Sequence, residues 1–480
     1  AYHANIYYMR ALAFGVLKQW EEARQAIEEA IERTEERSSI PVNYYLVHIE
    51  CCSKTGAYER AATSYRNAVL LDPNDVDIYR YAYWMYHDNN QIDAARSVLA
   101  EGIRYNPDER VLYQLQAFFH EDMGEYAAAA DDYTRLVDID SDNSIYYRTD
   151  RANCYYEIGE YEAALADMNY ALENGITVVG WDYELRGDIY SELEDIDLAV
   201  ADYEQAAELN EQNESIDYDL LAKLARGYLE VERYWDAINT FTVALLGEGY
   251  MSAHMDSLHA DYRDVGYAFA MLGYLDTALE YYNMAIMYNE YNDRYYLERG
   301  DLYVLIGDGE AALADYNTCF DLQELPSVDD IKRRGTLYYR MGKMDAAIAD
   351  FRAISDRTPY DPVAWGDLGK VYQAAGNHAA AIEAFTRNLS MRFADEYYWT
   401  EEMYLRAYSL AVLGDFEAAL EDLDLLISLD ESAFRPIHLK AEIHESTGDI
   451  AAAVAAYQHL HAVLTGYYGD DEVLMQDAPA

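Results

Sequence analysis

Arginine and aspartate residues sixteen positions apart form the most regular chemical feature of this chain. Such a pair can belong to an acid–base site, or it can be a structural ion pair that ties two helices together. Because it recurs five times, we interpret it as structural. The pairs are Arg151 with Asp167, Arg186 with Asp202, Arg299 with Asp315, Arg334 with Asp350, and Arg406 with Asp422.

Other residue types that carry chemistry are scattered. The sequence lacks the short motifs of nucleotide-binding proteins, zinc proteases and serine hydrolases. His459 and His461 are two residues apart, which places them on different sides of a helix and makes them poor ligands for one metal ion. Cys52 and Cys319 are interpreted as small, buried apolar residues. We therefore predict no catalytic residues, no metal and no cofactor, and a protein that is not an enzyme.

The charge of the chain narrows the classes of partner. Its formal net charge is −54 over 480 residues, a field that repels phosphate backbones and anionic lipid headgroups. Nucleic acid is therefore not an expected partner. No apolar run approaches the roughly 20 residues of a membrane helix, so direct membrane insertion of this segment is not expected either.

Cysteine content and the first residue bear on location. The four cysteines show no disulfide pattern, which favours a reduced compartment and a cytoplasmic, bacterial protein, although an exported bacterial protein is the alternative. The sequence begins with alanine, so it is compatible with a piece of a longer protein. Localisation and oligomeric state stay open.

A repeated unit accounts for most of the chain. One alanine, within a stretch rich in alanine and acidic residues, returns thirteen times with a base period of 34 residues. Longer gaps add residues at the junctions between units, as expected for insertions in loops. The anchors are Ala23, Ala61, Ala95, Ala129, Ala164, Ala199, Ala237, Ala278, Ala312, Ala347, Ala381, Ala419 and Ala453.

Each repeat has the pattern of a helical hairpin. A glycine usually stands five residues before the anchor alanine, as Gly159 does before Ala164. A small residue lies twelve before the anchor and an aromatic or large apolar residue four after it, as with Gly300 and Tyr316 around Ala312. Spacings of three and four place such residues on one helical face. The glycine is expected to end the first helix.

This 34-residue pattern resembles the tetratricopeptide repeat (TPR), with small residues at positions 8, 20 and 27 and aromatic residues at positions 11 and 24. The resemblance covers residues 1–464, and it implies an all-α, right-handed α-solenoid, or superhelix, of about thirteen helix–turn–helix units. We expect one continuous array over 1–464, with a possible subdivision near 245–260, and an acidic C-terminal tail over 465–480.

Within this frame the arginines occupy position 7 and the aspartates position 23. Most repeats that lack the arginine also lack the aspartate, as in the repeat that has Leu368 and Ala384 at these positions. The two positions face each other across a hairpin, so each pair is predicted to bridge its two helices. Partial burial favours arginine over lysine, because the planar guanidinium can meet a carboxylate with two hydrogen bonds.

The resemblance also implies that a partner lies in a concave groove lined by first-helix side chains. Trp84 and Phe118 occupy equivalent positions of neighbouring repeats and are predicted to form an aromatic step, although packing inside the array is the alternative. Residues 331–360 carry seven basic and three acidic residues, a local net charge of +4 in an acidic chain. The predicted groove residues are Trp84, Phe118, Tyr156, Arg226, Arg263, Tyr267, Lys332, Arg333, Tyr339, Arg340, Lys370 and Tyr408.

These features favour a non-catalytic scaffold that binds a peptide or protein, with an acidic segment as a possible ligand of the basic stretch. The alternative is a docking or sensory part of a larger protein, tethered to a membrane or catalytic elsewhere. The lysine, asparagine and arginine set with which some TPR proteins grip a terminal carboxylate is not reproduced here.

Overall fold

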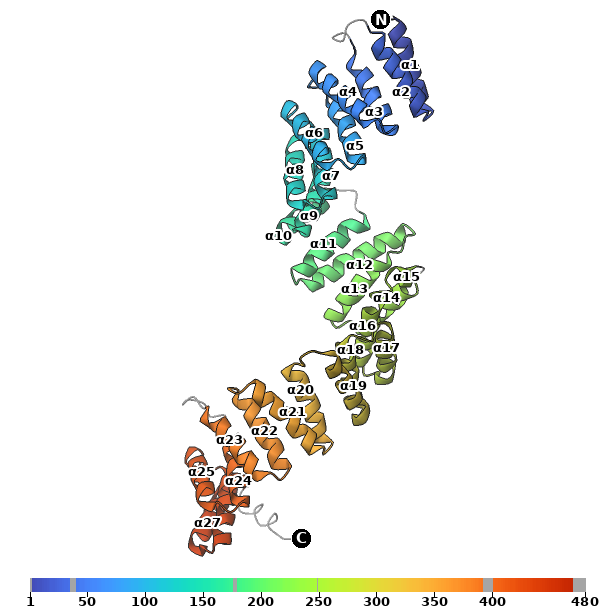
Figure 1. Ribbon diagram of the computed structural model, residues 1–480. Helices are drawn as coiled ribbons and strands as arrows, with labels where there is room; N and C mark the ends of the chain where they lie inside the picture. The colour runs from blue at the N-terminus through green and yellow to red at the C-terminus, as the bar shows by residue number, and fades with distance from the viewer. Residues whose placement is uncertain (1, 35–39, 176–178, 248, 392–399, 469–480) are drawn as a thin grey trace. The chain divides into compact units, whose positions relative to one another are not determined.

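The computed structural model describes residues 2–34, 40–175, 179–247, 249–391 and 400–468. Every regular element in these ranges is an α-helix, which confirms the predicted all-α solenoid of helical hairpins (Figure 1). The chain divides into two compact units, Ala1–Ala253 and His254–Ala480, which we call the N-terminal and the C-terminal unit. The boundary falls within the 245–260 segment.

The N-terminal unit contains repeats 1–7, each a pair of antiparallel helices, followed by the short helix α15. Its helices are α1 Tyr2–Val16, α2 Trp20–Glu32, α3 Val42–Lys54, α4 Tyr58–Leu71, α5 Val76–Asp88, α6 Ile92–Tyr105, α7 Arg110–Asp122, α8 Tyr126–Ile139, α9 Ser144–Glu157, α10 Tyr161–Glu173, α11 Gly180–Glu192, α12 Ile196–Gln212, α13 Tyr218–Glu230, α14 Tyr234–Leu245 and α15 Tyr250–Ala253.

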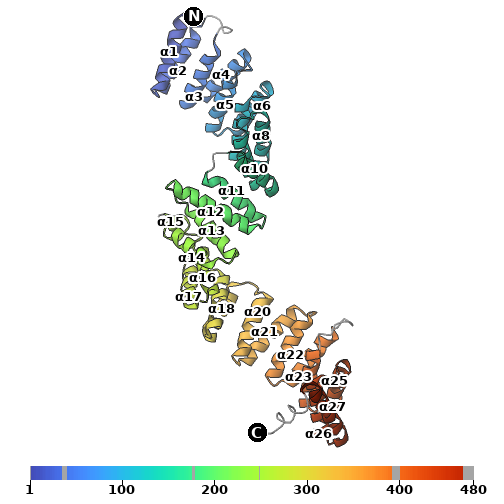
Figure 2. The same cartoon turned by 180° about the vertical axis from the view of Figure 1, so that it is seen from behind.

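The C-terminal unit contains repeats 8–13, which Figure 2 shows from behind. Its helices are α16 Leu258–Met271, α17 Leu275–Tyr288, α18 Asp293–Ile306, α19 Gly309–Leu322, α20 Val328–Arg340, α21 Met344–Arg357, α22 Pro362–Ala374, α23 His378–Ser390, α24 Thr400–Val412, α25 Phe416–Leu429, α26 Phe434–Thr447 and α27 Ile450–Tyr468. The last helix continues four residues past 464, and the rest of the predicted tail, 469–480, lies outside the described residues.

Two helices of a hairpin approach closely where a small residue meets a ring. A Cβ atom added at Gly300 would lie 2.6 Å from Tyr316, and one added at Gly369 would lie 2.5 Å from Phe385. Real Cβ atoms do not come so close, so a larger side chain would push the helices apart. The positions 8 and 24 found in the sequence are therefore one packing contact.

Repeat 3 packs its two helices equally tightly, but the large side chain stands on the first helix and the smaller one on the second. Tyr83 stands at the position that is usually small, and Leu99 replaces the usual aromatic residue. Both are fully buried in one cluster. Gly102 adds space in the second helix, because its Cα lies against the ring of Tyr79. The summed volume of facing side chains is kept while its distribution changes.

The turn between the two helices has one conformation in all thirteen repeats. The residue five before the anchor alanine has positive φ in each, which lets the chain leave the first helix and reverse. Nine repeats place glycine there, and glycine tolerates this region without strain. The other four use Lys18, Asn90, Glu194 and Glu232, with φ between 56° and 62°.

Replacing one of these non-glycine residues by glycine should relieve strain. We expect Glu232→Gly to raise the free energy of unfolding by about 1 kcal/mol, the steric penalty of a side chain in the left-handed region. Glu230→Gly is the matched control: Glu230 is also exposed, but it is the last residue of α13 and does not have positive φ, so glycine relieves no strain there. Urea unfolding followed by circular dichroism measures both. Equal effects of the two substitutions on the free energy of unfolding would contradict the prediction that the backbone of Glu232 is strained.

The five arginine–aspartate pairs join the two helices of their repeats. In each, the guanidinium Nε and Nη2 donate two parallel hydrogen bonds to the carboxylate, at 2.6–2.9 Å. The aspartates are buried, and the arginine side chains are 13–21% exposed. This geometry is the bidentate form that makes arginine preferable to lysine.

Each of these arginines also reaches the preceding repeat. The remaining terminal nitrogen donates to a polar side chain five residues after the anchor alanine of that repeat, at 2.6–3.2 Å. The bridge therefore connects three helices, two in its own repeat and one in its neighbour. The acceptors are Thr134, Asn169, Asn283, Asn317 and Thr386.

Repeat 4 satisfies its aspartate without arginine. Asp132 accepts hydrogen bonds from Gln116 at 2.8 Å and pairs with His120 Nδ1 at 2.7 Å. Burial raises the pKa of Asp132 to about 6, against the opposing effect of His120. The buried carboxylate at this position is thus always partnered, although the partner can change.

Removing one partner of an arginine–aspartate bridge should destabilise the protein more than replacing both partners by apolar residues. We expect Asp315→Ala to cost about 3 kcal/mol, because it strands a half-buried guanidinium. The double variant Arg299→Leu/Asp315→Ala copies the pair Leu368 and Ala384 of repeat 11 and should recover most of that loss, since apolar replacements of buried pairs are often neutral. Urea unfolding measures the free energy of unfolding of both variants. A double variant as unstable as the single one would show that the charges themselves are needed.

Candidate functional site

Two large aromatic side chains lie exposed next to each other on the first helices of repeats 3 and 4. Trp84 on α5 is 40% exposed and Phe118 on α7 is 44% exposed. Their ring centroids are 5.8 Å apart. The structure therefore places both residues on one surface, rather than in the interior that was the alternative. We call this surface, with His87, the aromatic step.

The aromatic step has a rigid base. His87 lies 5.7 Å from the Trp84 ring and 6.1 Å from the Phe118 ring, and its Nε2 is 3.1 Å from the Asp122 carboxylate. Beneath it, the buried Tyr83 packs edge-on against Trp84 at 5.0 Å. Rings held from below lose little freedom when a ligand covers them.

The other two predicted groove residues of the N-terminal unit lie apart from the aromatic step. Tyr156 on α9 is half-buried, with its ring 5.8 Å from Tyr161. Arg226 on α13 is exposed, and its guanidinium lies 6.0 Å from the centre of the Phe241 ring. Tyr156 belongs to repeat 5 and Arg226 to repeat 7, whereas the aromatic step belongs to repeats 3 and 4.

Charged side chains of both signs lie on the first helices that follow the aromatic step, with an acidic excess on α11, which carries four acids and one arginine. Burial raises the pKa of Asp150 to about 6, and the nearby charge of Glu121 adds to the shift. Lys223 Nζ bonds Glu184 at 2.9 Å and Asp188 at 2.7 Å, so this cation is already engaged.

In the C-terminal unit, first-helix residues line two hollows. The first, about 420 Å³, is lined by Lys332, Arg333 and Arg340 of α20 with Asp329, Thr336 and neighbouring side chains. The second, about 450 Å³, is lined by Tyr339 of α20, Lys370 of α22 and Tyr408 of α24 with Gln373 and His378. The structure thus brings six predicted groove residues together in two places.

Four of the seven cations of the basic stretch are paired with acids, three of them with acids of neighbouring repeats. Lys332 Nζ lies 2.7 Å from Asp367, Arg333 bonds Asp301, and Lys343 Nζ lies 2.8 Å from Glu310. Beyond the stretch, Lys370 Nζ lies 2.8 Å from Glu402. The positive surface is therefore smaller than the +4 count of residues 331–360 indicates. Among the described residues, Arg340 is exposed and has no ion-pair partner.

Arg263 and Tyr267, both on α16, complete the predicted set. Arg263 lies 3.3 Å from Asp264 and 4.0 Å from Glu298. Tyr267 is 37% exposed. Neither lines the two hollows described above.

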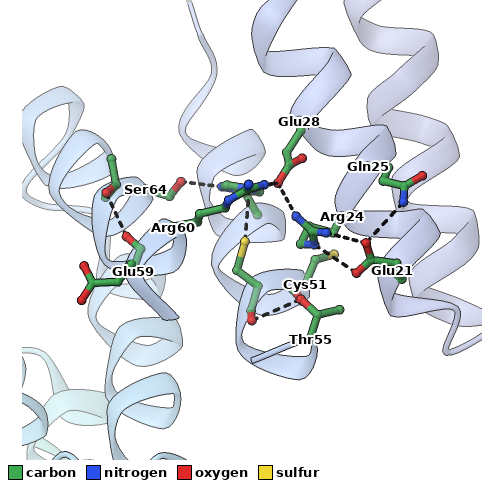
Figure 3. Close-up of polar contacts among 12 residues, drawn as sticks. Glu21, Arg24, Gln25, Glu28, Cys51, Thr55, Glu59, Arg60 and Ser64 are labelled. Atoms are coloured by element: carbon green, nitrogen blue, oxygen red, sulfur yellow. Dashed lines mark hydrogen bonds and ion pairs between the residues drawn. The ribbon is translucent and has the colours of Figure 1, made fainter. Parts of the chain in front are cut away.

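One polar cluster was missed by sequence reasoning. Glu28 of α2 and His48 and Cys52 of α3 bring a carboxylate oxygen, an imidazole nitrogen and a thiol within 4.8 Å of one another. The spacing of four residues between His48 and Cys52 puts both on one face of a helix and was a readable signal. Glu28 could not be assigned to them, because its place depends on how repeats 1 and 2 pack. Figure 3 shows the hydrogen bonds around this cluster.

No helix in the described part of the chain combines the length and the apolar character needed to cross a lipid bilayer.

Sequence profiles of the tetratricopeptide repeat match residues 2–114, 183–213 and 332–390. Among curated proteins, the Hsp70-Hsp90 organizing protein of Triticum aestivum is 24% identical over 208 residues, 41% of this chain and 32% of the relative. The TPR repeat-containing protein MJ1428 of Methanocaldococcus jannaschii is 24% identical over 307 residues, 58% of this chain and 49% of the relative. The chain thus spans half or less of the curated relatives it matches.

Two of the solved structures that are similar to the chain are described as tetratricopeptide repeat proteins. YrrB, described as a TPR protein with an unusual peptide-binding site, has a TM-score of 0.34 at 17% identity and aligns over 40% of this chain and 96% of its own. A tetratricopeptide repeat protein from Parabacteroides merdae has a TM-score of 0.36 at 18% identity, over 52% of this chain and 93% of its own.

Proposed function

The chain is a tetratricopeptide-repeat protein, and we propose that it is a non-catalytic scaffold that holds a peptide or protein segment against its first helices. Tetratricopeptide repeats generally serve as protein-interaction scaffolds. The observation that carries the proposal for this chain is the aromatic step. Two adjacent, exposed aromatic rings on a rigid base are the kind of surface on which binding energy concentrates.

The chemistry around the aromatic step indicates the kind of segment. Trp84 and Phe118 offer apolar faces, while the exposed Asp122 and the formal net charge of −54 of the chain make the surroundings negative. An apolar side chain flanked by lysine or arginine would contact the rings and meet complementary charge. The wheat relative is named for its role in organising Hsp70 and Hsp90, and a comparable adaptor role is part of this proposal.

A selection of random peptides displayed on phage tests the aromatic step. We expect selected peptides to carry an apolar residue beside basic ones, and Trp84→Ala to weaken their binding about 30-fold, the effect of a 2 kcal/mol hot spot. Trp235→Ala is the matched control, because Trp235 is 50% exposed but lies on the second helix α14. Binding that survives both Trp84→Ala and Phe118→Ala would contradict the proposal.

The first hollow of the C-terminal unit favours a second ligand, an acidic segment. Arg340 lines this hollow and has no ion-pair partner in the described part of the chain. Lys332 and Arg333, already paired, could exchange their acids for those of a ligand at little net cost, because all four groups are at least a quarter exposed.

Charge reversal at Arg340 tests this second site. We expect a fluorescent glutamate-rich octapeptide to bind more weakly to Arg340→Glu, by about tenfold, because an attraction of roughly 1.4 kcal/mol is lost. Arg352→Glu is the control, since Arg352 is also exposed and free of ion pairs among the described residues but lies on the second helix α21. Fluorescence anisotropy measures the affinity. Equal losses in the two variants would indicate only the general charge of the protein.

The alternative function, a docking or sensory part of a larger protein, is compatible with the same surfaces. It differs in what lies beyond these 480 residues. The complete reading frame distinguishes it, because a membrane anchor or a catalytic domain encoded with this segment would favour it.

A further inference from the structure

The polar cluster of repeats 1 and 2 is built from residues that bind metal ions. His48 and Cys52 lie one turn apart on α3, and Glu28 faces them from α2. His48 Nε2 is 3.2 Å from Cys52 Sγ and 3.4 Å from Glu28 Oε1. His48 is 7% exposed and Cys52 is fully buried. Three different donor types thus converge on one point in the interior of the N-terminal unit.

Two of the three spacings are close to those that a tetrahedral zinc ion imposes, and the third, between Cys52 Sγ and the Glu28 carboxylate, is at most 4.8 Å. With bonds of about 2.0 Å to nitrogen and oxygen and about 2.3 Å to sulfur, such an ion separates nitrogen from sulfur by about 3.5 Å and nitrogen from oxygen by about 3.3 Å. The observed 3.2 Å and 3.4 Å are close to both. An ion could therefore enter with small movements of the side chains.

The surroundings orient the imidazole for this role. His48 Nδ1 lies 2.6 Å from Ser64 Oγ of α4, so a proton on Nδ1 can be donated to the hydroxyl while Nε2 presents its lone pair to Cys52 and Glu28. A ligating histidine held by its second nitrogen is a regular feature of metal sites.

Two arginines bond the same Glu28 oxygen that lies near His48. Arg24 Nη1 is 2.8 Å and Arg60 Nη1 is 2.7 Å from Glu28 Oε1. Burial pushes the pKa of Glu28 up, but the hydrogen bonds from Arg60 and His48 and the charge of Arg24 bring it below its usual range. These cations reduce the affinity for a metal, yet Arg60 is 60% exposed and can move aside, and Arg24 is also neutralised by Glu21. Figure 3 shows Arg24 between Glu21 and Glu28.

We propose that Glu28, His48 and Cys52 bind a zinc ion, with a water molecule as the fourth ligand. Binding breaks the Sγ–H bond of Cys52, forms a zinc–thiolate bond and releases the proton to solvent. The site would fasten α2 to α3 and so lock repeats 1 and 2 together. It is separate from the proposed binding surfaces and does not depend on them, and it differs from the expectation of no metal and of an apolar role for Cys52.

Cobalt is the probe, because a cobalt–thiolate bond gives a charge-transfer band in the near ultraviolet. We expect the tag-free chain, stripped with a chelator, to bind one equivalent of Co²⁺ with this band, and Zn²⁺ to displace it. Cys52→Ala should abolish the band. Glu28→Gln should weaken Co²⁺ binding at least tenfold, and Ser64→Ala about tenfold, the usual effect of losing the group that orients a ligand.

Cys51→Ala is the matched control, because Cys51 is the buried neighbour on the same helix and lies outside the cluster. It should bind Co²⁺ as the unchanged chain does, and far-ultraviolet circular dichroism verifies that every variant stays helical. If Cys52→Ala does not fold, the Co²⁺ affinities of Glu28→Gln and Cys51→Ala are compared instead, and only Glu28→Gln should bind more weakly than the unchanged chain. No band in the unchanged chain, or a band that persists in Cys52→Ala, would show an ordinary hydrogen-bonded network and overturn the proposal.

Discussion

The close approach of two helices inside each hairpin is the constraint on which the rest of the structure depends. Where Gly187 meets Tyr203, or Gly369 meets Phe385, no atom heavier than hydrogen fits between the helix and the ring. This contact fixes the distance between the helices, and that distance decides which side chains can reach across. Repeat 3, with Tyr83 facing a smaller Leu99, shows that the sum of volumes matters more than the identity of either residue.

Polar side chains join the two helices beside this apolar contact. The bidentate arginine–aspartate bridges span the same pair of helices one residue away from it, and their third hydrogen bond reaches the preceding repeat. Tyrosine hydroxyls at the ring position add to these polar contacts, as when Tyr203 donates to Asp188 at 2.8 Å. Lys223 of the next repeat then bonds the same Asp188. Several charges that look free in the sequence are thus used between repeats, whereas Arg340 is exposed and has no ion-pair partner in the described part of the chain.

The sequence alone was sufficient to predict the features that recur from one 34-residue repeat to the next. Comparing repeats within one chain is enough to predict the hairpins, the turn residue and the pairing of Arg299 with Asp315, because each depends on spacing inside one repeat. Contacts between repeats could not be predicted in this way. The acids that pair with Lys332 and Lys370, and the meeting of Glu28 with His48, depend on the register of neighbouring hairpins, which insertions at the junctions change. The helix α15 lies in such an insertion.

Hydrogen–deuterium exchange of the variant Gly369→Val tests the close helix contact most directly. If the contact sets the spacing of each hairpin, the backbone amides of α22 and α23 will lose protection, with smaller losses in the adjoining α21 and α24 and none in the N-terminal unit, because each repeat is stabilised mainly by its nearest neighbours. Unchanged protection in α22 and α23 would contradict the account, and so would an equal loss in all helices.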